Sequence, residues 1–195
     1  MRWIHLLLLF AATAAAAQGT ETPNSVLLVA KPELADPNFR RTVVLVTQAA
    51  DASTVGVILN RPTIRKHEAS GEPIWLGGPV MRDVMVALFR WEQALPAAFQ
   101  VLDGVYLTMH PDNIARVLEA RGRRRLYAGF SGWMPSQLQG EMARESWYVL
   151  PATEELLFRA DTEGMWSELV EKARGARTQI DPALSKRDSL AILGP

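Results

Sequence analysis

The first half of the chain alternates short apolar runs with polar, turn-forming stretches. The apolar runs are rich in β-branched residues and have the length of strands, at residues 25–30, 42–47 and 55–62. The second run, TVVLVT, is apolar at almost every position, which predicts a strand buried on both faces. The sequence DPN at 36–38 predicts a tight turn between the first two strands. Pro62 ends the third strand, and the polar residues 63–76 predict a loop.

The second half mixes strand patterns with helix patterns. Further apolar runs predict strands at residues 84–90, 104–109, 125–130 and 147–151. Pro111 can open a helix, and the apolar residues Ile114, Val117 and Leu118 then fall on one face of it. Another helix is predicted to begin near Pro135.

A last amphipathic helix is predicted after Thr162, whose side chain can cap its first turn. Its inward face carries Trp166, Leu169, Val170 and Ala173, and Gly175 is predicted to end it. Strands outnumber helices, and the first three strands follow one another without an intervening helix. This order differs from the strict alternation of a doubly wound sheet. The sequence therefore predicts a single α+β domain, with a mixed sheet and about two to four helices packed against it.

Residues 1–17 have the three-part layout of a secretory signal peptide. Arg2 precedes an apolar run from Leu6, and the alanines up to Ala17 provide small residues for cleavage. The run is shorter than the stretch of about 20 residues that a membrane-spanning helix needs. We therefore expect cleavage after Ala17 and a mature domain over residues 18–195, periplasmic or secreted, with no membrane span after cleavage. The alternative is a misassigned start or an uncleaved segment, with a cytoplasmic location if the signal is wrong.

Composition narrows the classes of function. Hydrophobic residues make up 48% and charged residues 22% of the chain, as in ordinary folded domains. Lys and Arg total 21, as do Asp and Glu, so no overall field favours nucleic acid or an anionic membrane as a partner. The chain contains no cysteine, which excludes disulfides, thiol catalysis and zinc–thiolate sites. His67 and His110 have no companion at metal-ligand spacing, so neither a metal site nor a cofactor is predicted.

The stretch GFSGW at 129–133 places a serine between glycines, after an apolar strand and before a helix. A hydrolase nucleophile elbow has the spacing G-x-S-x-G, and its Asp or Glu and its His follow later in the chain. Here Gly132 comes one position early, and every histidine precedes Ser131. The sequence therefore favours a strand-to-helix turn, in which Gly132 needs a positive φ or a close backbone approach and Trp133 fills space between sheet and helix. No catalytic residue is predicted.

Three other stretches have both a chemical and a structural interpretation. Gly77-Gly78-Pro79 can present backbone N–H groups to an anion, but without P-loop spacing a backbone turn before a strand is favoured. The run RGRRR at 121–125 can bind phosphates, but its place after a helix favours solvated arginines that interact with the helix C-terminus. Gln137 and Glu141 share a helix face, which allows a site there, although surface hydrogen bonding is the simpler interpretation.

Taken in order, these motifs resemble the YqgE/AlgH family. The series is LLVAKPELADPNFRRTVVLVT, GVILNRP, GGPV and YAGFSGW, followed by QL, E and W, from about Leu27 to about Trp166. The resemblance implies an α+β fold with a mixed, partly barrel-like sheet surrounded by helices. It transfers no catalytic residue and no cofactor, because the family has none established.

The family pattern also selects candidate binding residues by resemblance alone. They are Asp36, Phe39, Asn60, Gly77, Gly78, Pro79, Gly132, Trp133, Gln137 and Glu141. The chain departs from the pattern at Met134-Pro135-Ser136, in its tail SLAILGP and in its export signal, since family members are generally cytoplasmic.

Together these observations predict an exported, non-enzymatic binding or interaction module that recognises a protein or a small ligand. Two alternatives stay open. One is an uncharacterised hydrolase or transferase that uses Ser131 or Asp36. The other is a transcription-linked regulator, which is favoured only by the label of one family lineage and which export would contradict.

Overall fold

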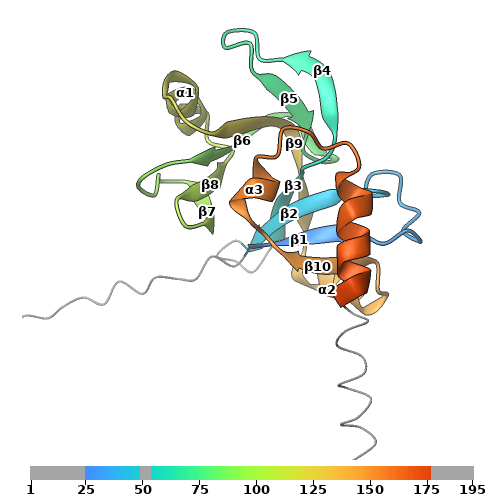
Figure 1. Cartoon of the computed structure of the whole chain (residues 1–195). Helices are drawn as coiled ribbons and strands as arrows, with labels where there is room; N and C mark the ends of the chain where they lie inside the picture. Colours follow the sequence, from blue (N-terminus) through green and yellow to red (C-terminus); the bar gives the residue numbers. More distant parts are fainter. Residues whose placement is uncertain (1–24, 49–53, 177–195) are drawn as a thin grey trace, which may run out of the picture.

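Within the part of the chain that the structure describes, ten strands form one sheet, and helices pack against it (Figure 1). The computed structural model describes residues 25–48 and 54–176. The strands are β1 (Ser25–Ala30), β2 (Val43–Gln48), β3 (Thr54–Ile58), β4 (Pro62–Lys66), β5 (Pro73–Leu76), β6 (Val80–Arg90), β7 (Ala98–Leu102), β8 (Val105–Thr108), β9 (Arg124–Trp133) and β10 (Trp147–Pro151). The helices are α1 (Pro111–Glu119), α2 (Pro135–Ala143), α3 (Glu154–Leu157) and a further helix over residues 165–176. The signal segment predicted for residues 1–17 lies outside the described residues.

The sheet is mixed, as predicted, and it curls into a half-barrel. Its strands follow the order β10-β1-β2-β3-β9-β6-β8-β7 with antiparallel neighbours, while β5 pairs with β9 in parallel and with β4 in a hairpin. The curl brings β7 back toward β2, where the Thr47 hydroxyl donates to the Gln100 carbonyl over 3.4 Å (Figure 1). The predicted α+β class with a partly barrel-like sheet is therefore confirmed.

Strand β9 joins the two halves of this sheet. Its residues 126–128 lie between β5 and β6, and its last residues, 131–133, pair with β3. The segment that carries the GFSGW stretch is thus held by strands on both edges. Its backbone position is fixed by ladder hydrogen bonds rather than by a helix cap.

Both faces of β1 and β2 are buried, which confirms the double burial predicted for TVVLVT. One face, with Leu27 and Leu45, packs into the main core together with Leu169 of the 165–176 helix. The other face, with Val44, packs against Trp133 and the α2 side of the molecule. Helix α1 covers a third cluster with β6 and β8. Each fully buried leucine in such a core stabilises the fold by about 1.5–3 kcal/mol.

The loop predicted for residues 63–76 is wrong, because this segment contains the β4–β5 hairpin. Most side chains of β4 are exposed, and Ile64 is completely so. A strand that buries neither face shows no alternation of apolar and polar residues, so the pattern gave no signal. The hairpin is held by pairing with β9 and by Thr63, whose hydroxyl donates to the Ile74 carbonyl over 2.5 Å.

Several predicted boundaries also change. Strand β6 begins at Val80 rather than at residue 84, and β7 and α3 were not predicted. Strand β9 continues to Trp133, so GFSGW belongs to a strand and not to a turn. The 165–176 helix buries Leu169 as predicted, but it continues past Gly175, which therefore does not end it.

Among the described residues, none of the helices combines the length and the apolar character needed to cross a membrane.

Candidate functional site

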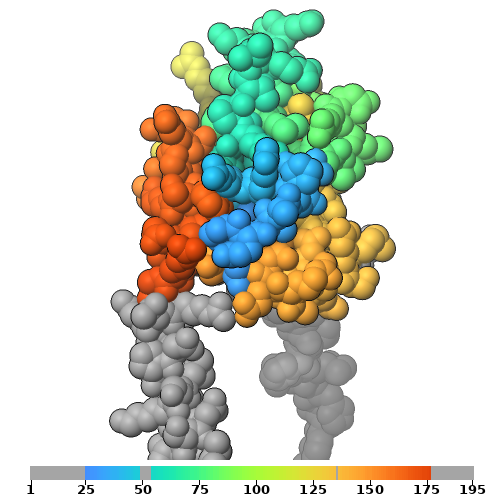
Figure 2. Space-filling view, turned by 90° about the vertical axis from the view of Figure 1, so that its right-hand side faces the viewer, coloured from blue at the N-terminus to red at the C-terminus, as the bar shows by residue number. Residues whose placement is uncertain are grey.

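Segments that are distant in sequence meet on one face of the molecule (Figure 2). The 36–42 turn (blue) faces the viewer there, with residues 60–76 (teal) above it and the α2 region (gold) below it. Within the turn, the N–H of Asn38 donates to Asp36 Oδ1 over 2.7 Å, and the N–H of Phe39 donates to the Asp36 carbonyl over 3.1 Å. These bonds confirm the predicted DPN turn and give Asp36 a structural role.

Five side chains gather below the turn, and we call Phe39, Trp133, Gln137, Glu141 and Trp147 the Glu141 cluster. The ring of Phe39 stacks on Trp133 with 5.3 Å between centroids and meets Trp147 edge-on at 5.7 Å. Glu141 Oε2 accepts the indole N–H groups of Trp133 over 3.1 Å and of Trp147 over 2.9 Å. Glu141 Oε1 accepts from Gln137 Nε2 over 3.3 Å, which confirms the shared face predicted for this pair. Glu141 therefore attaches α2 to both β9 and β10.

Asn60 holds the 36–42 turn against the sheet. Its Oδ1 accepts from the backbone N–H of Val43 over 2.9 Å, and its Nδ2 donates to the Arg41 carbonyl over 3.0 Å. Both polar atoms of the carboxamide thus satisfy backbone groups at the start of β2. The residue fixes where the turn ends.

At Gly77 and Gly78 the backbone passes very close to the backbone of residues 129–130 in β9, and we call this contact the glycine crossing. A Cβ on Gly77 would lie 2.1 Å from the Gly129 carbonyl oxygen, and one on Gly78 would lie 2.2 Å from the Phe130 carbonyl oxygen. The Gly77 N–H already donates to the Ala128 carbonyl over 3.0 Å. These contacts support the structural interpretation of the GGP segment over an anion cradle. Its last residue, Pro79, directly precedes β6.

The glycine requirement predicted at Gly132 is wrong, because the constraint falls at Gly129. A Cβ on Gly132 would come no nearer than 3.5 Å to the Phe130 ring, which is an ordinary contact. Gly129 instead has a φ of +71°, and its Cβ would lie 2.8 Å from the Val80 carbonyl oxygen. Trp133 is buried, as predicted for a residue that fills space beside the helix.

Ser131 is fully buried and donates to the Gly77 carbonyl over 3.2 Å. In residues 25–48 and 54–176, no histidine or carboxylate is hydrogen-bonded to its hydroxyl. A nucleophilic serine needs a base within hydrogen-bond reach and a path to the substrate. The contacts of Ser131 are those of a residue that closes the glycine crossing.

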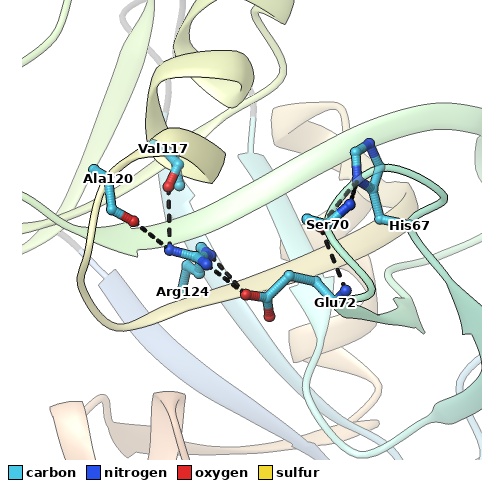
Figure 3. A network of polar contacts seen from close by, with 6 residues as sticks. All are labelled: His67, Ser70, Glu72, Val117, Ala120 and Arg124. Atoms are coloured by element: carbon cyan, nitrogen blue, oxygen red, sulfur yellow. Dashed lines mark hydrogen bonds and ion pairs between the residues drawn. The ribbon is translucent and has the colours of Figure 1, made fainter.

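The arginine run is less solvated than the sequence predicts (Figure 3). Arg124 donates to Glu72 Oε1 from Nε over 2.9 Å and from Nη2 over 2.6 Å. Its Nη1 donates to the carbonyls of Val117 and Ala120 at the end of α1, over 3.3 and 2.6 Å. The predicted interaction with the helix C-terminus is therefore confirmed, whereas the predicted solvation of Arg124 is wrong.

Arg125 departs further from that prediction. It is buried, its guanidinium lies 4.3 Å from the centroid of the Trp75 ring, and it donates to the carbonyls of Leu59 and Arg159. The reason is the β4–β5 hairpin, which was not predicted and which supplies both Trp75 and Glu72.

The two histidines of the described segments lie in separate places. His67 Nδ1 is 3.0 Å from the Ser70 hydroxyl in the turn of the hairpin (Figure 3). His110 directly precedes α1, as predicted, with its Nδ1 4.0 Å from Asp112 Oδ2. Within the part of the chain that the structure describes, no three His, Asp or Glu side chains are grouped to hold a metal ion.

An open groove of about 400 Å³ lies beside the Glu141 cluster, and we call it the Trp133 groove. Its mostly apolar lining is formed by Thr54, Val55, Val80, Phe99, Met109, Phe130, Gly132, Trp133, Met134 and Gln137. Met134 at its rim is 66% exposed. Gln137 directs its NH₂ group to Glu141, and its carboxamide oxygen accepts no hydrogen bond from any described residue. The groove thus combines exposed apolar surface with an unused acceptor on Gln137.

The groove brings together three of the predicted candidates, Gly132, Trp133 and Gln137. The remaining candidates lie elsewhere, where they stabilise the 36–42 turn, form the Glu141 cluster or take part in the glycine crossing. Sequence reasoning missed Phe99 and Met134 as lining residues. Phe99 lies on β7, which had no strand pattern, and the only signal for Met134 was the departure from the family pattern at 134–136.

These features define the class of the protein: a half-barrel α+β domain held together by a glycine crossing and by a carboxylate shared between two indoles. Residues 27–177 match the AlgH-like family, DUF179. The chain belongs to this AlgH-like family, which confirms the resemblance seen in the sequence motifs.

Relatives and solved structures agree with this assignment. The UPF0301 protein of Thermobifida fusca is 35% identical over 170 residues, covering 76% of this chain and 86% of that protein. The UPF0301 protein of Chlorobium limicola is 32% identical over 165 residues, covering 79% and 88%. The solution structure of AlgH from Pseudomonas aeruginosa has a TM-score of 0.65 at 22% identity and covers 78% of this chain and 89% of its own. At this identity the similarity shows the shared fold.

Proposed function

We propose that this AlgH-like protein is an exported, non-enzymatic binding module whose ligand or partner occupies the Trp133 groove. The observation that carries the proposal is the groove itself, with its apolar walls, exposed rim and unused Gln137 oxygen. Export is inferred from the signal-like residues 1–17.

The lining indicates what the groove accepts. An apolar group that covers Met134 and Phe99 gains about 25 cal/mol for each Å² of apolar surface removed from water. The Gln137 oxygen calls for an N–H or O–H donor beside that group, since a covered acceptor without a donor costs about 1–3 kcal/mol. An apolar side chain next to a peptide N–H satisfies both requirements. We therefore infer a peptide segment of a protein partner or a small peptide-like ligand.

The contacts of Ser131 and Asp36 favour binding over the alternative of a hydrolase or transferase. Ser131 donates to a backbone carbonyl, and Asp36 Oδ1 accepts a backbone N–H within its own turn. No specific observation favours a transcription-linked regulator, and we propose neither nucleic acid nor a cofactor as a ligand.

A thermal-shift screen of residues 18–195 against periplasmic metabolites and cell-wall peptide fragments tests the proposal. A ligand at 100-fold its Kd should add about 2.7 kcal/mol to the free energy of unfolding. Met134→Glu should abolish the shift, because it places a charge on the groove rim. Val149→Glu is the matched control, since Val149 is 47% exposed on β10 and is not part of the groove lining. A shift that survives Met134→Glu, or that Val149→Glu removes equally, would contradict the proposal.

A further inference from the structure

A hollow of about 350 Å³ lies where the start of β9 meets α3 and the residues that follow it, and we call it the α3 hollow. It shares no lining residue with the Trp133 groove. Its lining combines cations, an anion and an aromatic ring, and it consists of Arg123, Arg124, Glu155, Phe158 and Arg159. The α3 hollow is therefore a polar site with one apolar wall, unlike the mostly apolar groove.

Direct contacts hold the arginines of the α3 hollow in place. Arg123 Nη1 donates to Glu154 Oε1 over 3.2 Å. Arg159 donates from Nη1 to Glu168 Oε2 over 2.6 Å and from Nε to the Asp161 carbonyl over 2.8 Å. Arg124 is fixed by its contacts with the hairpin and with the end of α1 (Figure 3). Ion pairs and backbone contacts thus aim the three guanidinium groups at one cavity.

Two of these arginines keep donors for a ligand. Arg124 uses all three of its nitrogens in the contacts of Figure 3. In residues 25–48 and 54–176, by contrast, no acceptor takes a hydrogen bond from Nε or Nη2 of Arg123 or from Nη2 of Arg159. Guanidinium donors match the two oxygens of a carboxylate. Arg123 and Arg159 can therefore bind a carboxylate without giving up their present partners.

Glu155 and Phe158 supply the other two features of the α3 hollow. The Glu155 carboxylate forms no ion pair and accepts no hydrogen bond from any residue that the structure describes. Phe158 packs against the main core and also lines the hollow. The carboxylate can accept from a cationic donor, and the ring can cover an apolar group.

The charges on the lining and on its ion-pair partners balance. The cations are the three lining arginines and Arg90, which shares the Glu154 carboxylate with Arg123. The anions are equal in number, four against four, and they are Glu72, Glu154, Glu155 and Glu168. A ligand with a single charge would disturb this balance, whereas a ligand with one charge of each sign preserves it.

We propose that the α3 hollow binds a zwitterion with an apolar side chain, either a free α-amino acid or a short peptide. Arg123 and Arg159 bind the carboxylate, Glu155 binds the ammonium group, and the Phe158 ring covers the side chain. The two sources share this chemistry of recognition. The site binds its ligand through charge-assisted hydrogen bonds and does not transform it. It is independent of the function proposed for the Trp133 groove.

Titration calorimetry of the purified protein at low salt, where charges are least screened, tests the proposal. L-leucine represents the free amino acid, and the dipeptide Leu-Leu represents the short peptide. N-acetyl-leucine lacks the ammonium group, and leucine amide lacks the carboxylate. Each of these two compounds should bind at least about tenfold more weakly than leucine, because one charge-assisted contact is lost.

Two variants remove one charge each from the α3 hollow, Arg123→Gln and Glu155→Gln. Both side chains lie at exposed positions, so the fold is expected to remain intact. The matched controls Arg116→Gln and Glu33→Gln remove the same charges from exposed positions outside the hollow. Met134→Glu controls for binding of the peptide in the Trp133 groove.

Arg123→Gln and Glu155→Gln should each weaken binding of the zwitterion by about tenfold or more. Glu155→Gln should leave the weak binding of N-acetyl-leucine unchanged, and the three controls should bind like the wild type. Tighter binding of leucine or of Leu-Leu identifies the source. The proposal would be overturned by no binding of either compound, by equal binding of N-acetyl-leucine or leucine amide, or by binding that survives both variants. Equal loss in the matched controls, or loss only in Met134→Glu, would overturn it as well.

Discussion

At the scale of single residues, Tyr127 carries a polar atom that the core does not satisfy. Its side chain is fully buried in the main cluster, and no hydrogen bond of good geometry reaches its hydroxyl from a described residue. Burial raises the pKa of Tyr127 to about 12, and the positive charge of Arg125 opposes this rise only in part. The hydroxyl is therefore held neutral in the core, with the Arg125 side chain nearby but no hydrogen bond of good geometry, which makes its removal informative.

Tyr127→Phe should leave stability at pH 7 unchanged or slightly higher, since it deletes an unpaired buried hydroxyl. An unfolded tyrosine ionises near pH 10, so above that value the unfolded chain loses a proton that the folded chain keeps. The contribution of the neutral Tyr127 to the free energy of unfolding is thus fully present below about pH 10. It is lost between about pH 10 and 12, at roughly 1.4 kcal/mol per pH unit. Urea melts of the wild type and the variant at about pH 7 and 11 measure the difference. An identical loss at high pH in both proteins would contradict the pKa assigned to Tyr127.

The glycine crossing gives a second prediction at this scale. Gly78→Ala places a Cβ 2.2 Å from the Phe130 carbonyl oxygen and should cost about 1–3 kcal/mol or more. Gly132→Ala is the matched control in the paired strand, and its open surroundings limit the cost to about 0.5 kcal/mol. Urea melts compare the two. Equal losses would mean that the backbones do not cross as described.

Helical spacing predicted that Gln137 and Glu141 share a face, and they do. It did not predict that Glu141 accepts the indole N–H groups of Trp133 and Trp147, because these residues reach α2 from two different strands. The same holds for Gly129, whose positive φ depends on a crossing with residues far back in the chain. Contacts within one helix or strand can be predicted from residue spacing, whereas contacts between elements can be predicted only once the fold is known.

At the scale of elements, the β4–β5 hairpin depends on side chains from elsewhere. Arg124 joins the hairpin, through Glu72, to the end of α1 (Figure 3). Both partners are largely buried, with 18% and 27% of their side chains exposed. The ion pair therefore acts as an anchor for a hairpin whose outer strand, β4, buries little of its own surface.

Arg124→Ala should loosen the hairpin and cost about 1.5–3 kcal/mol, the value of hydrogen bonds to a charged group. Hydrogen exchange should accelerate in residues 62–76 and stay unchanged in β1 and β2. Arg123→Ala is the control, because its ion pair with Glu154 is more exposed and does not reach the hairpin. Unchanged exchange in residues 62–76 would show that β9 pairing alone holds the hairpin.

The elements that the sequence predicted are those that bury apolar side chains. Strands β1, β2, β8 and β10 and helices α1 and α2 lie close to their predicted positions. Strands β4, β5 and β7 were missed because they are short and partly exposed, so backbone pairing rather than burial places them. β7 supplies Phe99 to the groove, and part of the candidate site was therefore missed with it.

At the scale of the whole molecule, the 36–42 turn supports one wall of the proposed groove. Phe39 of this turn stacks on Trp133, which forms that wall. The family motifs thus position the groove without forming it alone.

The proposed export gives a prediction for residues 1–17. Mass spectrometry of the protein purified from the periplasm or the medium should show an N-terminus near Gln18, because the small residues before it suit signal peptidase. Replacing Ala15 and Ala17 by bulky residues should block the cleavage. An intact Met1 in the exported protein would contradict the signal assignment.

The central claim is that the protein binds its ligand in the Trp133 groove, and a hydrogen-exchange footprint tests it most directly. The measurement compares the free protein with the protein saturated by the compound that gives the largest thermal shift. The account predicts slower exchange in residues 98–102 and 130–138, which contribute Phe99, Trp133 and Gln137 to the groove. Protection confined to other parts of the chain, or the absence of any compound that shifts the melting temperature, would contradict it.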